Sequence, residues 1–265
     1  MSHEKNNSFE DIFGKKKAFL GMVHLRPTVG YPNHPGIDKF IAHAVTDATA
    51  LESGGSHGIC IENDRDDPHT ILVTTEQEQC ILKATQAVVN AVSIPVGVGV
   101  LLNDWRAALN IAKKAGCAYV RIDVFVDRVQ CDQGIIEPEA DAIIAYRKKI
   151  GAEHIAIFAD IQVKHKILLE KGKDLITSAQ QAMDAGAAAV TVTGTATGEE
   201  TPIADVRHVK EAFPEFPVLI GAGVNLNNAH EQFSVADGAF VGSSLKTAED
   251  AVDEEKVRAI ISMIE

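Results

Sequence analysis

The chain has 265 residues, of which 46% are hydrophobic and 23% are charged, and its formal net charge at pH 7 is −12. These values are ordinary for a globular protein and supply enough apolar residues for a core without disulfides or metals. The acidic balance argues against a broad surface for nucleic acid or for an anionic membrane, since both require clustered Lys and Arg.

The four cysteines lack the C-x-x-C spacing of metal or redox sites and lie in or beside apolar segments. This pattern is typical of reduced structural thiols. The first residues are polar and acidic, without the apolar stretch of a secretory signal, and no apolar run approaches the roughly 20 residues that span a bilayer. We therefore expect a cytoplasmic protein without an integral membrane segment, and homo-oligomer formation stays open.

Short runs rich in β-branched residues recur along the whole chain, with segments of helical spacing between them. Eight of these runs have the length and composition of buried strands. They are residues 18–25, 57–63, 94–103, 118–125, 154–163, 188–194, 217–225 and 237–245.

Each predicted strand is followed by a segment with the spacing of an amphipathic helix. Eight parallel strands joined by helices close into a (β/α)₈ barrel, whereas about six would favour an open doubly wound sheet. The sequence thus predicts one barrel domain over residues 1–265, with residues 1–16 as an N-terminal extension that serves as a packing arm or as a floor for the barrel. The predicted helices are residues 37–54, 76–92, 105–116, 138–151, 174–187, 203–213, 226–236 and 248–264.

The run FADIQVKHK, residues 158–166, places four polar groups where a buried strand ends. Because side chains alternate across a strand, Asp160, Gln162 and Lys164 share one face. That face points into the barrel at its C-terminal mouth, the end where barrel enzymes keep their chemistry. His165 has the opposite parity, which favours an outward loop histidine.

The same parity argument brings polar residues from the other strands to the mouth, including Thr191 in the sixth. The alternative for the charged residues is a set of satisfied interior ion pairs, Arg121 with Asp123 and Glu62 with Lys164. The predicted catalytic residues are His24, Glu62, Arg121, Asp123, Asp160 and Lys164, and the predicted substrate-binding residues are Asn103, Gln162, Thr193 and Asn225.

Several chemical roles are open to these residues. Asp160 or Glu62 could act as a general base if burial raises its pKa, and His24 or His165 could move a proton near neutrality. Lys164 could stabilise a developing oxyanion or, with a lowered pKa, form a Schiff base with a carbonyl. The oxyanion role is favoured, since nearby carboxylates favour a charged lysine. An alternative is a Mg or Mn ion on Glu62, Asp123, Asp160 and His24, although no spacing motif supports it.

Two glycine-rich segments, GAGVN (221–225) and VGSSLK (241–246), follow the last two predicted strands. Glycine lets backbone N–H groups approach a ligand closely, and phosphate commonly sits between these two loops of a barrel. TGTATGEE (193–200) could reach the same anion or act as a lid. The alternative is that the glycines only form tight turns. The predicted phosphate-binding residues are Gly221, Gly223, Gly242, Ser243 and Ser244, which makes the barrel one of the phosphate-binding type.

Five segments carry a further signal: GMVHLRPTVGYP (21–32), RIDVFV (121–126), ADIQVKHK (159–166), TVTGTATG (191–198) and GAGVN. Together they resemble the BtpA/SgcQ family over nearly the whole chain. The resemblance implies a (β/α)₈ barrel akin to phosphate-binding barrels. Cyanobacterial members of that family are associated with stable accumulation of photosystem I, while members in organisms without photosynthesis, some beside sugar-uptake genes, suggest a role in small-molecule metabolism.

We therefore expect an enzyme that acts on a phosphorylated sugar or nucleoside-like metabolite, by isomerase, lyase or transferase chemistry at the mouth. The alternative is a non-catalytic assembly or stability factor, as in the photosystem I role. An interaction protein needs an exposed apolar patch and does not need charges at inward strand positions. The inward charges therefore favour the enzyme.

Overall fold

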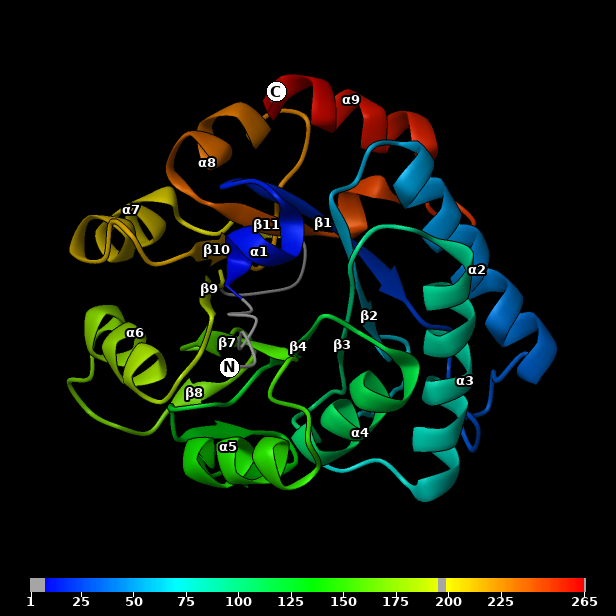
Figure 1. The fold of residues 1–265 in the computed structure, drawn as a ribbon, viewed down its shortest axis with the longest axis horizontal. Coiled ribbons are helices and arrows are strands. Elements are labelled where there is room, and N and C mark those ends of the chain that lie inside the picture. Colours follow the sequence, from blue (N-terminus) through cyan, green and yellow to red (C-terminus); the bar gives the residue numbers. More distant parts are fainter. Residues whose placement is uncertain (1–7, 195–198, 265) are drawn as a thin grey trace, which may run out of the picture.

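The computed structural model describes residues 8–194 and 199–264, and its central feature is a ring of parallel strands (Figure 1). The ring closes in the order β1-β11-β10-β9-β7-β4-β3-β2. Every one of these strands lies within a run predicted from the sequence, so the (β/α)₈ barrel is confirmed. The strands are β1 (Ala18–His24), β2 (Gly58–Glu62), β3 (Val96–Gly99), β4 (Tyr119–Ile122), β7 (Ala156–Ile161), β9 (Ala189–Val192), β10 (Val218–Ile220) and β11 (Gly238–Val241).

Helices surround the barrel: seven of them connect successive strands of the ring, and one more follows the last strand (Figure 1). Local capping explains several of their ends: Thr74 forms a capping box with Gln77, and Gly116 closes its helix in the left-handed conformation. The last helix starts later than predicted, because Lys246 and Val252 pair as a β-bridge in the segment before it. The helices are α2 (Ile37–Ser53), α3 (Thr75–Ala91), α4 (Trp105–Ala115), α5 (Ala140–Lys149), α6 (Leu175–Asp184), α7 (Ile203–Ala212), α8 (Ala229–Val235) and α9 (Glu254–Ile264).

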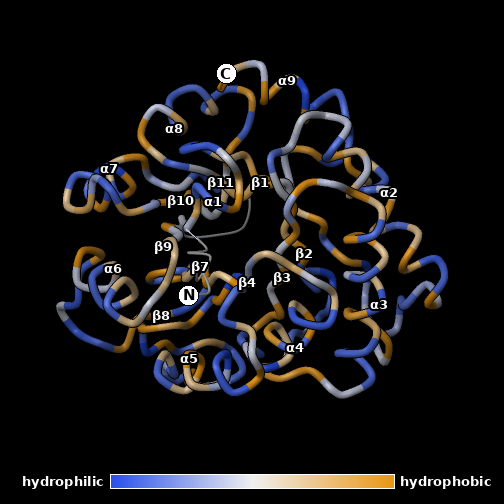
Figure 2. The backbone as a smooth tube through the Cα atoms, in the orientation of Figure 1, coloured by the Kyte–Doolittle hydropathy of each residue, from blue (hydrophilic) through white to orange (hydrophobic). Residues whose placement is uncertain are grey.

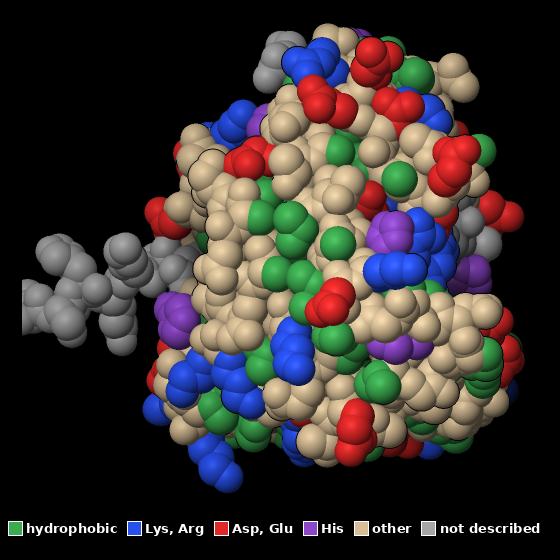
Figure 3. Space-filling view, turned by 90° about the vertical axis from the view of Figure 1, so that its right-hand side faces the viewer, with side chains coloured by type: hydrophobic (Ala, Val, Ile, Leu, Met, Phe, Trp, Pro, Cys, Tyr) green, Lys and Arg blue, Asp and Glu red, His purple; other side chains and the backbone are tan. Residues whose placement is uncertain are grey.

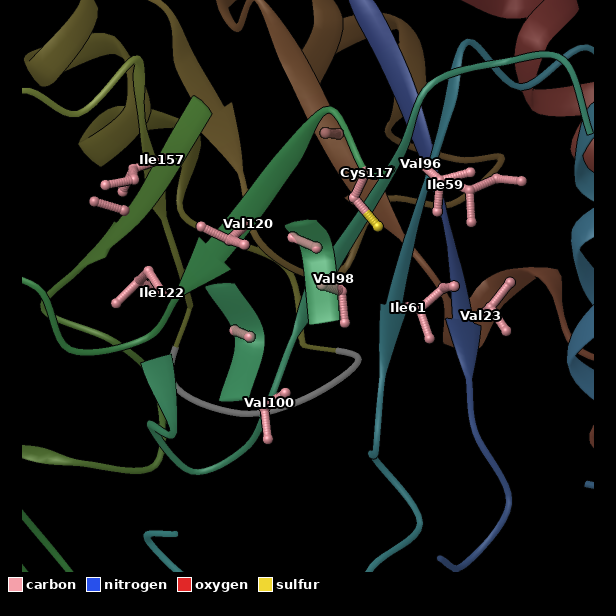
Figure 4. Packing of buried hydrophobic residues seen from close by; sticks show 14 of the residues in the cluster. Val23, Ile59, Ile61, Val96, Val98, Val100, Cys117, Val120, Ile122 and Ile157 are labelled. Atoms are coloured by element: carbon pink, nitrogen blue, oxygen red, sulfur yellow. The ribbon is translucent and has the colours of Figure 1, made fainter. Parts of the chain in front are cut away.

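The largest apolar layer lies between the strands and the helices. Figure 4 shows alternate residues of the strands, such as Ile59 and Ile61 of β2 and Val96 and Val98 of β3, within this layer. Figure 2 shows the same pattern along the whole backbone, with hydrophobic strands in the middle and polar segments outside. Because the side chains on one face of each strand pack in this layer, the side chains on the other face fill the barrel interior.

The floor of the barrel is closed by α1 (Phe9–Phe13), a short helix in the predicted N-terminal extension. Ser8 and Asp11 form a capping box that starts this helix, and Gly14 ends it in the left-handed conformation. Phe9 and Phe13 are buried, with ring centroids 5.9 and 6.2 Å from that of Phe158. The extension therefore acts as a floor; residues 1–7 lie outside the described part.

A second, three-stranded sheet with the order β6-β5-β8 was not predicted. It consists of β5 (Val129–Cys131), β6 (Gly134–Ile136) and β8 (Ile167–Leu168), and it packs through Val129 and Ile136 against Val163 beside the mouth. Among the described residues, no helix is long and apolar enough to cross a membrane. On the face over α2 and α3, hydrophobic and charged side chains are interspersed (Figure 3).

Candidate functional site

A buried cluster of charged side chains crosses the barrel interior at its mouth. Arg121 on β4 donates from Nε to Asp160 Oδ1 (2.9 Å) and from Nη2 to Asp160 Oδ2 (2.8 Å). Its third nitrogen, Nη1, donates to Glu62 Oε1 at 3.2 Å. The guanidinium carbon lies 4.4 Å from the centre of the Phe240 ring. Arg121 is therefore fixed from three sides, and its fork geometry suits two carboxylates at once.

Glu62 is the carboxylate of this cluster that faces open space. Asp160 is 1% exposed and lines neither of the two cavities at the mouth, whereas Glu62 lines both. Burial raises the pKa of Glu62 to about 7, against the opposing effect of Arg121. The single positive charge of Arg121 can neutralise one carboxylate, and Asp160 is the carboxylate that binds the guanidinium through both oxygens. Glu62 is thus suited to exchange a proton near neutral pH.

His24 lies beside Glu62, since the two residues pair across β1 and β2. Burial lowers the pKa of His24 to about 4, so the imidazole is neutral at pH 7. The proposed proton shuttle near neutrality does not fit this value. Within the described part of the chain, the buried Nδ1 atom of His24 has no hydrogen-bond partner, and the Asp64 carboxylate lies 3.9 Å away. His24 is placed to contact a ligand as a neutral group.

The predicted ion pairs of the mouth have different partners from those expected. Arg121 pairs with Asp160 and Glu62, and Asp123 pairs with Lys166 at 2.8 Å. Burial alone would raise the pKa of Asp123, but Lys166 and Arg121 lower it. Lys164 makes no ion pair or side-chain hydrogen bond with any described residue, and burial together with the Arg121 charge lowers its pKa. Glu62, Asp160 and Asp123 raise the pKa of Lys164, as expected, but burial and the Arg121 charge outweigh them.

Gln162 does not join Asp160 and Lys164 at the mouth. Strand β7 ends at Ile161, and Gln162 adopts a positive φ of 46°, which breaks the alternation of the strand. Its side chain turns toward α6, where Nε2 donates to Lys173 O and Ser178 Oγ at 3.2 and 3.3 Å. The predicted inward position of Gln162 is wrong. His165, with a φ of 61°, lines the second cavity described below.

The other predicted substrate-binding residues hold the loops of the mouth. Asn103 exchanges two hydrogen bonds with the backbone of Val124, at 2.9 and 3.0 Å. Thr193 Oγ1 accepts a hydrogen bond of 2.8 Å from the backbone N–H of Lys164. Asn225 lines the first cavity and donates from Nδ2 to Gly223 O. The structure thus gives Asn103 and Thr193 a positioning role, while Asn225 faces the open space.

The glycine-rich loops after β10 and β11 stand against the charged cluster. A Cβ atom on Gly221 would lie 2.6 Å from Thr193 Cγ2, and one on Gly242 would lie 2.7 Å from His24 Cε1. Gly223 has a φ of 79°, and a Cβ there would meet the backbone of Glu199. Only glycine allows these close approaches. Ser244 donates its hydroxyl to Val224 O at 2.7 Å and so ties the two loops together; residues 195–198 of the third predicted loop lie outside the described part.

Two cavities meet at the charged cluster. The first, of about 310 Å³, lies between the cluster and the glycine-rich loops and includes Gly221, Gly223, Gly242, Ser243 and Ser244 in its lining. The second, of about 470 Å³, lies under the β5–β6 hairpin and includes Asp123, Cys131 and Lys166. Four residues line both cavities: Glu62, Asp64, Arg121 and Lys164. Asp64 was missed by the parity argument because it follows the end of β2.

The four residues considered for a divalent metal do not fit one. Asp160 and Glu62 are bound to Arg121, and Asp123 is bound to Lys166. In residues 8–194 and 199–264, no three His, Cys, Asp or Glu side chains are grouped to hold a metal ion. Cations of the protein occupy the places that Mg or Mn would take.

Comparison with known proteins identifies the family. The BtpA family model matches residues 15–265. The chain belongs to the BtpA family. An uncharacterized protein from Archaeoglobus fulgidus is 35% identical over 246 residues, covering 93% of this chain and 98% of that protein. The Photosystem I biogenesis protein BtpA of Synechocystis is 33% identical over 258 residues, covering 94% of this chain and 88% of that protein.

Among solved structures, this BtpA family member is similar to 2-keto-3-deoxy-6-phospho-gluconate aldolase from Zymomonas mobilis. The TM-score is 0.60 at 14% sequence identity, and the alignment covers 97% of this chain and 96% of the aldolase. At this identity the similarity shows the barrel fold alone.

Proposed function

We propose that this protein is an enzyme that acts on a phosphorylated sugar or nucleoside-like metabolite, by isomerase, lyase or transferase chemistry at the barrel mouth. The observation that carries this proposal is the first cavity. It has the backbone of two glycine-rich loops on one side, and Glu62, Arg121 and Lys164 on the other. A cavity that combines an anion-binding wall with a titrating carboxylate has the parts that such a reaction requires.

The loops form the anion-binding wall. In the turn after β11, the first backbone hydrogen bond runs from Leu245 N to Gly242 O at 2.9 Å. The N–H groups of Ser243 and Ser244 come before Leu245 in the chain, so this bond does not engage them. Backbone amides of this kind, beside the Arg121 guanidinium, suit a phosphate group. The Asn225 side chain completes this wall.

The reacting end of the substrate lies at the boundary of the two cavities in this proposal. Glu62, with a pKa of about 7, donates or accepts the proton. Arg121 and Lys164 face the same position, where the Arg121 guanidinium stabilises negative charge that develops. The second cavity gives room for the remainder of the substrate. The name of the Zymomonas mobilis aldolase specifies a phosphorylated compound, which is in keeping with this proposal.

Ser243→Asp tests the anion-binding wall, because a carboxylate there repels phosphate. We expect inorganic phosphate and ribose 5-phosphate, but not ribose, to raise the Tm of the wild-type protein and to bind in calorimetry. Ser243→Asp should lower both affinities at least tenfold, by about 1.4 kcal/mol or more. Ser262→Asp, which adds the same charge at an exposed position on α9, is the control. Equal affinities in Ser243→Asp and wild type would contradict the proposal.

A second candidate is an assembly or stability factor, as the name of the Synechocystis relative indicates. The large exposed hydrophobic side chains include Ile135 and Ile167, which both pair with Gln130 in the small sheet. A factor that acts only through this outer surface does not depend on the mouth. Complementation of a deletion strain separates the two functions: Ser243→Asp fails if the mouth acts, and Ile135→Lys fails if the surface acts.

A further inference from the structure

Lys164 differs from the other buried lysines of the protein in having no partner. Lys166, Lys173 and Lys246 have side chains that are 4–7% exposed, and each lies 2.7 or 2.8 Å from an aspartate oxygen. In the described part of the chain, Lys164 Nζ makes no hydrogen bond or ion pair, although its backbone N–H is held by Thr193. Partial burial without an ion-pair partner makes the ammonium form of Lys164 less favourable than in water, which shifts the equilibrium toward the neutral amine.

The neighbouring carboxylates are occupied in a way that keeps Lys164 unpaired. Arg121 donates hydrogen bonds to both oxygens of Asp160 and to one oxygen of Glu62, and Lys166 donates one to Asp123. Burial and the Arg121 charge act in the same direction on Lys164 and lower its pKa. A lysine that served only as a fixed positive charge would duplicate Arg121, which remains charged at any physiological pH.

The backbone around Lys164 is held in an uncommon conformation. Gln162 and His165 both have positive φ values, 46° and 61°, which residues other than glycine seldom adopt. Val163 is anchored between them in the apolar cluster under the small sheet. This double turn brings the Lys164 side chain to the wall shared by the two cavities, beside Glu62.

We propose that Lys164 is a nucleophile that forms a Schiff base with the carbonyl carbon of a phosphorylated aldehyde or ketone, and that Glu62 transfers the protons. This inference rests on the proposed function and names its substrate class. The phosphate lies on the glycine-rich loops, and the carbonyl lies between Lys164 and Glu62. An amine is strongly nucleophilic only when neutral, which the unpaired buried position provides.

The step balances without any further reactant. Lys164 Nζ adds to the carbonyl carbon, and the π electron pair moves to the oxygen. Glu62, in its protonated form, gives its proton to that oxygen and takes one from the nitrogen in return, which gives a carbinolamine and leaves Glu62 protonated. Protonated Glu62 then gives its proton to the hydroxyl group, water leaves, and the nitrogen lone pair forms the C=N bond of the iminium. Glu62 is left as a carboxylate that can accept a proton from the adjacent carbon or its hydroxyl, which fits an isomerase or a lyase.

Reductive trapping tests the proposal. The protein is incubated with dihydroxyacetone phosphate or glyceraldehyde 3-phosphate and sodium cyanoborohydride, and the adduct is located by intact mass and peptide mapping. We expect one adduct, on Lys164, formed at least tenfold faster than with unphosphorylated dihydroxyacetone. Lys164→Arg should abolish it, Glu62→Gln should slow it at least tenfold, and Lys171→Arg, at an exposed neighbouring lysine, should leave it unchanged.

The outcomes separate this inference from the proposed function. Labelling spread over surface lysines, or an adduct that persists in Lys164→Arg, overturns the Schiff base. An absence of adduct while phosphate still raises the Tm also overturns it, and leaves the anion site standing. An absence of both the adduct and the phosphate effect overturns the two proposals together.

Discussion

The two ends of the barrel interior are built from the same strands with opposite chemistry. At the floor, β2, β4 and β7 turn Cys60, Tyr119 and Phe158 inward, where they pack with α1. Two residues further along each strand, the inward positions hold Glu62, Arg121 and Asp160. Apolar contacts at the floor stabilise the fold directly. Buried charges at the mouth do not, because the cost of desolvation can exceed the gain from pairing.

This difference shows which end of the barrel serves stability and which serves chemistry. An apolar layer at the mouth would be as stable or more stable, so the charged layer is best explained by a ligand. The floor and the mouth should therefore respond differently to substitution, pH and ligands.

The largest effect is expected at the floor. Phe13→Ala removes a buried ring that packs on Tyr119 and Phe158, and should lower the free energy of unfolding by about 3–5 kcal/mol. Affinity for ribose 5-phosphate should stay within a factor of about two, because the mouth is unchanged. Urea unfolding and calorimetry measure the two quantities. Glu10→Ala, at an exposed position of the same helix, is the control, and a loss of affinity in Phe13→Ala would show that floor and mouth are not independent.

A comparable effect is expected from breaking the charged layer. Arg121→Met leaves Glu62 and Asp160 buried without a cation, which should lower the free energy of unfolding at pH 7.5 by about 3–5 kcal/mol. Lowering the pH to 5.5 should restore part of the loss, since both carboxylates can then take up protons. Arg128→Met breaks an exposed pair with Glu137 and should cost less than about 1 kcal/mol. Similar losses in the two variants would mean that the mouth pair is not effectively buried.

Strand parity was enough to predict the layers of the barrel and most of the mouth. Arg121 and Asp160 were placed inward because they alternate with outward apolar residues, and the structure has them there. The partners of Arg121 could not be predicted, since contacts between strands depend on their register and on the tilt of the barrel. In the structure Arg121 pairs in register with Phe158, and its side chain reaches forward to Asp160.

Parity failed where the backbone leaves the strand. Gln162 has a positive φ, yet no glycine or asparagine at that position signals it, so the side chain was assigned to the wrong side. The small sheet was missed because its strands have only two or three residues. The pKa of His24 depends on how completely neighbouring loops bury it, which no local pattern records. These failures concern loops, whereas the barrel strands were predicted correctly.

The smallest predicted effect concerns the pH dependence of stability, and it originates from Glu62. Its pKa is about 7 in the folded protein, against an ordinary value of 4.5. Between these values the folded protein keeps a proton that the unfolded chain has released, so stability falls as the pH rises from about 4.5 to 7 and is level above that. Each pKa unit corresponds to about 1.4 kcal/mol, which makes the contribution of Glu62 between pH 5 and 7.5 a fall of about 2–3 kcal/mol. His24, whose pKa is lowered to about 4, contributes a rise in stability up to about pH 6.5, so the Glu62 contribution is measured as the difference between wild type and a Glu62 variant.

Glu62→Gln should remove the Glu62 contribution and leave that of His24, because the amide does not titrate. Urea unfolding at pH 5 and 7.5 should therefore show the variant gaining about 2–3 kcal/mol relative to wild type at the higher pH. Glu137→Gln, at an exposed glutamate, should follow the wild-type dependence. If Glu62→Gln and wild type lose stability in parallel, Glu62 is already ionised in the folded protein at pH 5. Glu62 would then be an ordinary ion-pair partner of Arg121, and the mouth would lack the proton donor that the proposed reaction requires.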